Sequence, residues 1–139
     1  MIKPLITNSR SVRIAWAAGP PLALALAGLF HPSDLSTSTA AQWRVLHLVL
    51  LPLFPLLAVG PWLLARQQGR TVGRVVAALG YTYVCCYTAL DVLAGIAAGA
   101  LQLRGLSDGV GVAFEQANVV VRWGVVAYLV ASVLAAALI

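Results

Sequence analysis

The sequence predicts an all-α integral membrane protein: a single domain, residues 1–139, in which four transmembrane helices kinked at prolines form a bundle. The first observation behind this prediction is composition, because 61% of the residues are hydrophobic and 9% are charged, whereas soluble domains carry roughly 25% charged residues. The second is length, since four apolar stretches can each cross roughly 30 Å of hydrocarbon at about 1.5 Å per residue. The third is the uneven placement of the basic residues.

The predicted spans cover residues 14–30, 44–65, 75–101 and 117–139. Prolines should disturb the first two, because a proline lacks the amide hydrogen of the helical ladder and crowds the preceding turn. Pro20 and Pro21 should kink the first span or delay its start. Pro52, Pro55 and Pro61 should bend the second span, whose freed carbonyls then need partners from neighbouring helices. We therefore expect the second helix to be central in the bundle.

The segment before the second span is rich in serine and threonine. Thr39 and Gln42 stand three residues apart just before an apolar run, which is the spacing of a capping box. In that motif each side chain caps an amide at the helix start. The sequence therefore predicts a loop that ends in a capped helix N-terminus.

The basic residues predict the orientation of the bundle. Two segments without any acid carry six of them: Lys3, Arg10, Arg13, Arg66, Arg70 and Arg74. The positive-inside rule places both segments in the cytoplasm, and with four spans the C-terminus lies there too. One lysine against eight arginines favours a bacterial origin. The expected location is therefore the inner (plasma) membrane, with several passes and both termini cytoplasmic.

Asp91 is the most informative single residue, because it lies deep inside the third predicted span. A charged group near the bilayer centre is costly, and it is usually paired, lines a cavity or carries a proton. Its helix face also holds Tyr87 and the pair Gly95-x-x-x-Gly99, which lets another backbone approach closely. We expect Asp91 to point into a helix interface, either as a structural hydrogen-bonding group or as part of a site.

Polar residues of the fourth span are expected at a similar depth, in the outer half of the bilayer. Glu115, Asn118 and Arg122 share one helix face, because they are three and four residues apart. Arg122 is the natural partner of Asp91, although an arginine can also extend its long side chain outwards to the membrane surface. The fourth span thus adds an acid, an amide and a base to the same region.

The second span adds Arg44 and His47, which lie one turn apart near its outer end, and His31 ends the first span. We therefore predict a ligand-binding pocket in the outer leaflet, lined by Arg44, His47, Asp91, Glu115, Asn118 and Arg122. No motif implies a cofactor. His31 and His47 are nevertheless the candidate ligands for one, because each sits near the outer end of its helix.

Three functions remain open for such a pocket. The preferred one is non-enzymatic: a small membrane protein that binds a lipid or a partner membrane subunit, with Arg44 and Arg122 taking a phosphate or carboxylate. The second is a redox or metal enzyme subunit in which His31 and His47 hold a haem or a metal ion. The third is a proton-coupled small transporter with Asp91 as the titrating group.

Other functional classes find no support in the sequence. A nucleic-acid binder needs a basic face exposed to water, and the basic residues here lie in short segments between apolar spans. Neither a nucleophile motif nor a glycine-rich phosphate loop is present. The expected partners are therefore the lipid bilayer and other membrane subunits or further copies of the chain, and not nucleic acid.

Overall fold

The structure, a computed structural model, describes residues 10–137, and within this range it contains helices and no β-strand. The all-α prediction is therefore confirmed. In chain order the elements are α1 (Arg10–Gly28), α2 (Ala40–Leu50), η1 (Phe54–Ala58), α3 (Val59–Ala65), α4 (Arg70–Leu90), η2 (Asp91–Ala97), α5 (Ala98–Leu103) and α6 (Ser107–Ala136). The segment η1 is a 3₁₀-helix and η2 is a π-helix.

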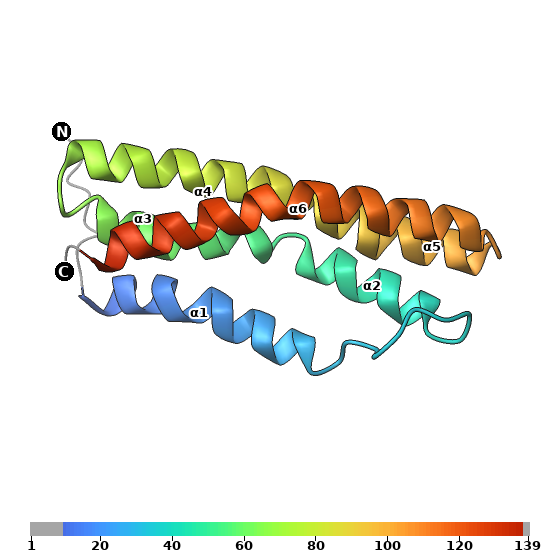
Figure 1. Cartoon of the computed structure of the whole chain (residues 1–139). Helices are drawn as coiled ribbons and strands as arrows, with labels where there is room; N and C mark the ends of the chain where they lie inside the picture. Colours follow the sequence, from blue (N-terminus) through green and yellow to red (C-terminus); the bar gives the residue numbers. More distant parts are fainter. Residues whose placement is uncertain (1–9, 138–139) are drawn as a thin grey trace, which may run out of the picture.

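The helices lie side by side along one long axis (Figure 1). The elements α4, η2 and α5 form one continuous helix, and α6 returns along it. The elements α2, η1 and α3 form a broken helix that packs against α4, η2 and α5, and α3 also contacts α6. Helix α1 packs mainly against η1 and α3. The start of α1, the α3–α4 turn and the end of α6 thus share one end of the molecule.

Small residues fill the interfaces between these helices. The buried residues of α6 are Ala113, Ala117, Gly124, Ala127, Ala131 and Ala135. An added Cβ at Gly124 would lie 2.7 Å from the Cβ of Cys86, so α4 and α6 approach closely there. Large apolar residues of α6, such as Leu129 and Val133, are exposed instead. This distribution is typical of helices that pack in lipid, where burying a large apolar side chain gains little.

Among the described residues, two helices are long and apolar enough to cross a membrane, Arg70–Leu103 and Ser107–Ala136. A third span is added if Ala40–Leu50 and Phe54–Ala65, which meet at 40°, count as one bent helix. Helix α1 contains most of the first predicted span. It is not among the helices that meet these requirements of length and apolar composition. The structure is thus compatible with a membrane protein, and the four-span bundle stays a prediction.

Helix α1 begins well before Pro20 and Pro21 and continues through both, so the delayed start expected at these prolines is wrong. Packing explains why the turn before the prolines stays helical. An added Cβ at Gly60 of α3 would lie 3.2 Å from the Cα of Ala17, so the two backbones touch at this turn. Contact with α3 therefore outweighs the hydrogen bonds that the two prolines remove.

The second predicted span is interrupted at residues 51–53, where the helix axis turns by 40°. Pro52 lies in the interruption, and Pro55 lies in the first turn of η1. The amide of Leu53 donates to the carbonyl of Leu50 at 2.8 Å and closes the turn. The bend divides this segment into α2 and a second part made of η1 and α3, so the two parts contact different stretches of the α4–α5 helix.

Thr39 and Gln42 do not form the predicted capping box, although α2 does begin directly after Thr39. The Thr39 hydroxyl donates to the carbonyl of Asp34 at 2.8 Å, and the Gln42 amide donates to the carbonyl of Phe30 at 2.9 Å. Both side chains therefore tie the loop of residues 29–39 to the start of α2. The loop carbonyls of Phe30 and Asp34 therefore hold the two side chains that a local cap would have used at the start of α2.

Two glycines of α6 test the close contact between α4 and α6. We expect Gly124→Ala to lower the free energy of unfolding by about 1–3 kcal/mol, because the new methyl group overlaps Cys86. The control is Gly111→Ala, where an added Cβ meets nothing within 4 Å. That change should raise the unfolding free energy by about 0.5–1 kcal/mol, because alanine restricts the unfolded chain. Denaturation in detergent measures both, and equal effects would contradict this packing.

Candidate functional site

Asp91 is the first residue of the π-helix η2, and its side chain is 2% exposed. Neither carboxyl oxygen has a hydrogen-bond partner within the described residues. A buried carboxylate without a partner is far more costly than a buried neutral group, and most buried polar atoms in proteins are paired. Asp91 is therefore a candidate functional residue. Its burial agrees with the expectation that it points into a helix interface.

The π-helix itself is part of the site. A π-turn contains one extra residue in the helix, and such turns are frequent at functional sites. Here the carbonyl of Ala94 accepts a hydrogen bond from the indole Nε1–H of Trp43 at 3.0 Å. This bond fastens α2 to η2. The sequence carries no simple sign of a π-helix, which is why this feature was not predicted.

His47 lies directly on the π-helix, one turn along from Asp91. A Cβ added to Gly95 would lie 2.2 Å from Cδ2 of the His47 ring, so only glycine leaves room for the imidazole. At Gly99 an added Cβ would lie 2.9 Å from the Cβ of Arg44. The Gly95-x-x-x-Gly99 pair therefore provides the flat surface on which α2 rests. Asp91 and His47 belong to helix faces that meet at this contact.

The structure brings His31 and His47 together, with their ring centroids 5.2 Å apart. The Trp43 ring packs against both, with its centroid 4.5 Å from that of His31 and 5.1 Å from that of His47. Nδ1 of His31 lies 2.7 Å from the carbonyl of Pro32, and Nδ1 of His47 lies 2.7 Å from the carbonyl of Trp43. In each contact the ring N–H donates to the carbonyl, which leaves Nε2 with a free lone pair.

In this pair each Nδ1–H is held by a backbone carbonyl and each Nε2 is free, which is the arrangement that orients metal-ligating imidazoles. A closed metal site needs three or four ligands. Within residues 10–137 no three His, Cys, Asp or Glu side chains lie close enough to share a metal ion. The pair therefore suits a ligand that takes two imidazoles, or a proton, better than a metal ion held by protein groups alone.

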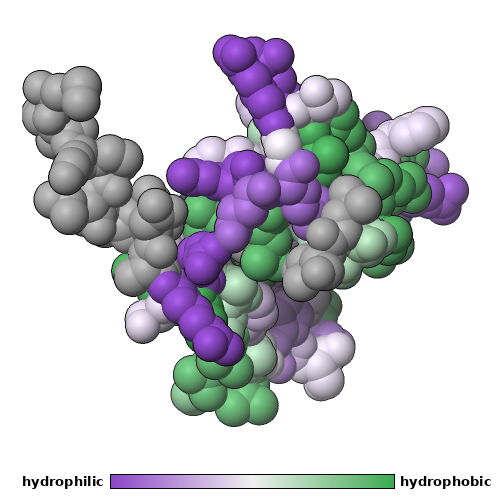
Figure 2. Space-filling view, turned by 90° about the vertical axis from the view of Figure 1, so that its left-hand side faces the viewer, coloured by the Kyte–Doolittle hydropathy of each residue, from purple (hydrophilic) through white to green (hydrophobic). Residues whose placement is uncertain are grey.

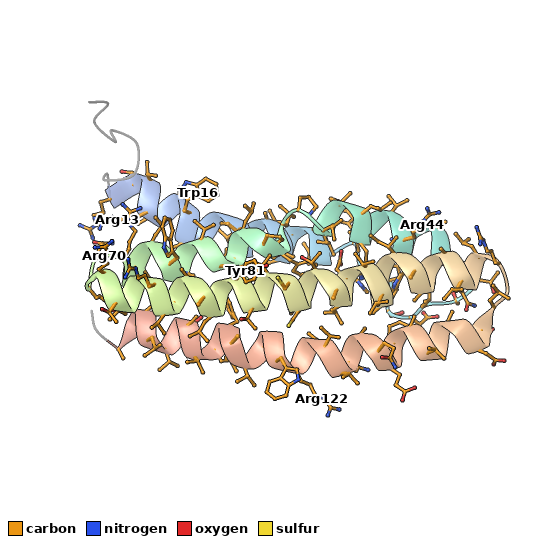
Figure 3. The ribbon with its side chains drawn as sticks, turned by 90° about the horizontal axis from the view of Figure 1, so that it is seen from above. Arg13, Trp16, Arg44, Arg70, Tyr81 and Arg122 are labelled. Carbon is orange, nitrogen blue, oxygen red and sulfur yellow. The ribbon has the colours of Figure 1, made fainter. Side chains whose placement is uncertain are left out.

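The four other residues of the predicted pocket are exposed: Arg44, Glu115, Asn118 and Arg122. Figure 3 shows Arg44 and Arg122 extending away from the bundle, from α2 and α6. No ion pair joins Arg122 to Asp91. The structure thus brings together His31, His47 and the helix face of Asp91, and it leaves the other four on outward surfaces, where a role in ligand binding stays a prediction.

Three tyrosines extend the site and were not among the predicted pocket residues. Tyr87 lies one turn before Asp91, and its ring centroid is 5.1 Å from that of Tyr83. The Tyr83 ring in turn lies 4.7 Å from Tyr128 of α6. The Tyr83 hydroxyl is buried and has no partner within the described residues. Spacing alone could have found Tyr83, because it lies two turns from Asp91 on the same helix face.

Comparisons with protein-family models, with curated proteins and with solved structures found no match to this chain. No related protein therefore bears on its activity. Three features of the molecule itself bear on its function: the buried carboxyl, the histidine pair and the distribution of charge over the helices.

Proposed function

We propose that this chain is a four-span membrane protein that binds a proton at Asp91 and works as a proton-coupled small transporter. The observation that carries the proposal is the Asp91 carboxyl, 2% exposed and without a hydrogen-bond partner for either oxygen in the described part of the chain. Intramembrane acids of this kind mark proton relays and ion pathways. A π-helix that begins at the same residue supports this assignment.

Four spans are supported by the exposed surface of α1. This helix has 19 residues, about 28 Å at 1.5 Å per residue, which matches a hydrocarbon layer of roughly 30 Å. Its apolar side chains Leu22 and Leu26 are more than 60% exposed, which water would penalise and lipid would not. The bent segment of α2, η1 and α3 then crosses beside it, followed by the α4–α5 helix and α6.

The charge distribution supports a cytoplasmic location for one end of the bundle. Arg13 and Arg70 lie at that end in Figure 3, and the Arg13 guanidinium donates to the Gln67 side chain. Viewed along the axis, hydrophilic side chains gather at this end beside apolar surface (Figure 2). None of the four acids of the chain lies in the segments that form this end of the bundle. The positive-inside rule then directs it to the cytoplasm of a bacterial cell.

The depth of the site follows from α1. The loop of residues 29–39 is rich in serine and carries Asp34, so it belongs outside the hydrocarbon, and His31 lies at its beginning. Because His31 contacts His47, and His47 rests on Gly95, the histidine pair lies near the outer boundary of the membrane. Asp91 lies one helical turn deeper than Gly95 on the same helix.

This arrangement suggests the order in which a proton moves. His31 is exposed and His47 is half-buried, so the pair leads from the loop towards the buried carboxyl. A neutral imidazole can accept a proton at Nε2 and release it again near neutral pH, which suits it for a relay. An isolated carboxylate is unstable in apolar surroundings, so Asp91 holds the arriving proton. Tyr87 and Tyr83 continue the series of polar groups along α4.

A second function is favoured by the geometry of His31 and His47, namely a subunit that binds a cofactor such as haem between two imidazoles. Both rings have Nδ1 fixed and Nε2 free, which suits axial ligation. The rings now touch each other at 5.2 Å, so His31 and its loop would have to move to admit a porphyrin. The outward residues Arg44, Glu115, Asn118 and Arg122 remain a proposed surface for lipid or for another membrane subunit.

The transport proposal is tested in proteoliposomes with a pH-sensitive dye inside and a potassium diffusion potential. We expect proton uptake in the wild type, inhibition by dicyclohexylcarbodiimide, which modifies protonated carboxyls in apolar sites, and uptake at the level of empty liposomes for Asp91→Asn. The matched control is Glu115→Gln, which removes an exposed carboxyl and should leave uptake and inhibition unchanged. Equal uptake by Asp91→Asn and wild type would refute a role for Asp91.

The topology is tested by cysteine labelling in a background of Cys85→Ala and Cys86→Ala. Ser107→Cys lies at the start of α6, next to the α5–α6 turn, and Gln67→Cys lies in the turn between α3 and α4. We expect a membrane-impermeant maleimide to label Ser107→Cys in intact spheroplasts and Gln67→Cys only after permeabilisation. Labelling of both positions from the same side would contradict an odd number of crossings between them.

The cofactor function is tested by an absorption spectrum and metal analysis of protein purified in mild detergent. A Soret band or stoichiometric metal that is lost in both His31→Ala and His47→Ala would establish the second function in place of the first. On the transport proposal we expect a colourless, metal-free protein. The control variant is Trp43→Phe, which keeps both imidazoles and so should keep any ligand that they bind.

A further inference from the structure

A cavity of about 380 Å³ opens between α3 and α4 at the basic end of the bundle. Arg66, Arg70 and Arg74 line it together with Trp62. Within residues 10–137 none of these three guanidinium groups makes a hydrogen bond or an ion pair, and no acid of the chain lies in either helix. A guanidinium group carries five donors in a fixed fork that fits a phosphate. The cavity is therefore suited to an anion.

An apolar groove of about 200 Å³ continues from this cavity along the same two helices. Trp62 and Ala77 line both spaces, so the groove and the cavity adjoin. The groove extends past Gly80 to Val84. An added Cβ at Gly80 would lie 3.2 Å from the Cβ of Ala58, so α4 and η1 approach closely along the groove. From Arg70 to Val84 the distance along α4 is about 21 Å at 1.5 Å per residue, comparable to a stretched acyl chain.

The cavity and the groove together fit an amphiphile with an anionic head and an apolar tail. Free phosphate or a nucleotide would leave the groove unused, and a lipid without net charge would leave the positive charge of three arginines uncompensated. The Arg66 guanidinium lies 5.1 Å from the centre of the Trp62 ring, so this cation–π pair stands where head and tail meet. Tryptophan is enriched at this level of membrane proteins, and basic pockets between helices on the cytoplasmic side suit acidic lipid headgroups.

We propose that an anionic phospholipid of the inner leaflet binds between α3 and α4. Its phosphate lies among Arg66, Arg70 and Arg74, and one acyl chain follows the groove over Trp62 and Ala77. This inference rests on the four-span topology proposed above but not on proton binding at Asp91. The site lies at the opposite end of the bundle from the histidine pair, so a failure of either proposal can be recognised without affecting the other.

Native mass spectrometry of the full chain in mild detergent tests the proposal with phosphatidylglycerol and phosphatidylcholine of the same acyl chains. We expect retention of phosphatidylglycerol in clear excess over phosphatidylcholine. Arg70→Gln and Arg74→Gln should each lower its apparent affinity about fivefold, the value of one basic residue at a membrane surface. The control Arg10→Gln removes an equal charge at the same end but outside the cavity, and it should change the affinity less than twofold (roughly 0.4 kcal/mol).

A second pair of variants tests the groove. Ala77→Phe fills the junction of the cavity and the groove, and it should abolish the preference for phosphatidylglycerol over phosphatidylcholine. Ala78→Phe, on the neighbouring exposed position, should not. Equal retention of the two lipids, or equal effects of Ala77→Phe and Ala78→Phe, would overturn the proposal. Displacement of the lipid by millimolar inorganic phosphate would also overturn it, because the site would then recognise a free anion. Circular dichroism of each variant verifies that the helices are retained.

Discussion

The close approach of helix backbones over small residues is the constraint on which the rest of this structure depends. In lipid, the burial of large apolar side chains gives helices no reason to associate, and van der Waals contact between backbones takes over. The alanine face of α6 with Gly124, the contact of Gly60 with Ala17, and the Gly95–Gly99 surface under α2 are instances of one rule. Each contact fixes the depth and rotation of a helix, and so fixes which polar groups meet.

Asp91 acquires its environment through these contacts. The Gly95 surface brings His47 against the turn that follows Asp91, and the Trp43 indole is fastened to the carbonyl of Ala94 in the π-helix. Both contacts lie on the turn that follows Asp91, whose carboxyl is buried without a hydrogen-bond partner in the described residues. A buried carboxyl is far less costly with its proton than without it, and this is why we place the proposed proton-binding function there.

The two ends of the bundle differ in the chemistry that they offer. One end presents arginines without acids, above an apolar groove of the size of a lipid chain. At the level of the other, the histidine pair joins the polar loop of residues 29–39 to the π-helix that begins at Asp91. If both proposals hold, a bound anionic lipid would anchor α3 against α4 at the cytoplasmic side, while proton exchange takes place near the outer side. The lipid would then stabilise the helices that hold Asp91 without taking part in transport.

Composition and the i, i+4 spacing of Asp91, Gly95 and Gly99 were sufficient to predict helices and an interior position for Asp91, because those properties depend on neighbours along the chain. The start of α1 before its prolines, the use of Thr39 and Gln42 in a loop, and the π-helix depend on contacts between distant segments and had no local sign. The predicted pocket shows the same limit. Helix periodicity placed Glu115, Asn118 and Arg122 on one face, but the tertiary structure decided that this face points outwards, because the alanines on the opposite side of α6 allow the closer packing.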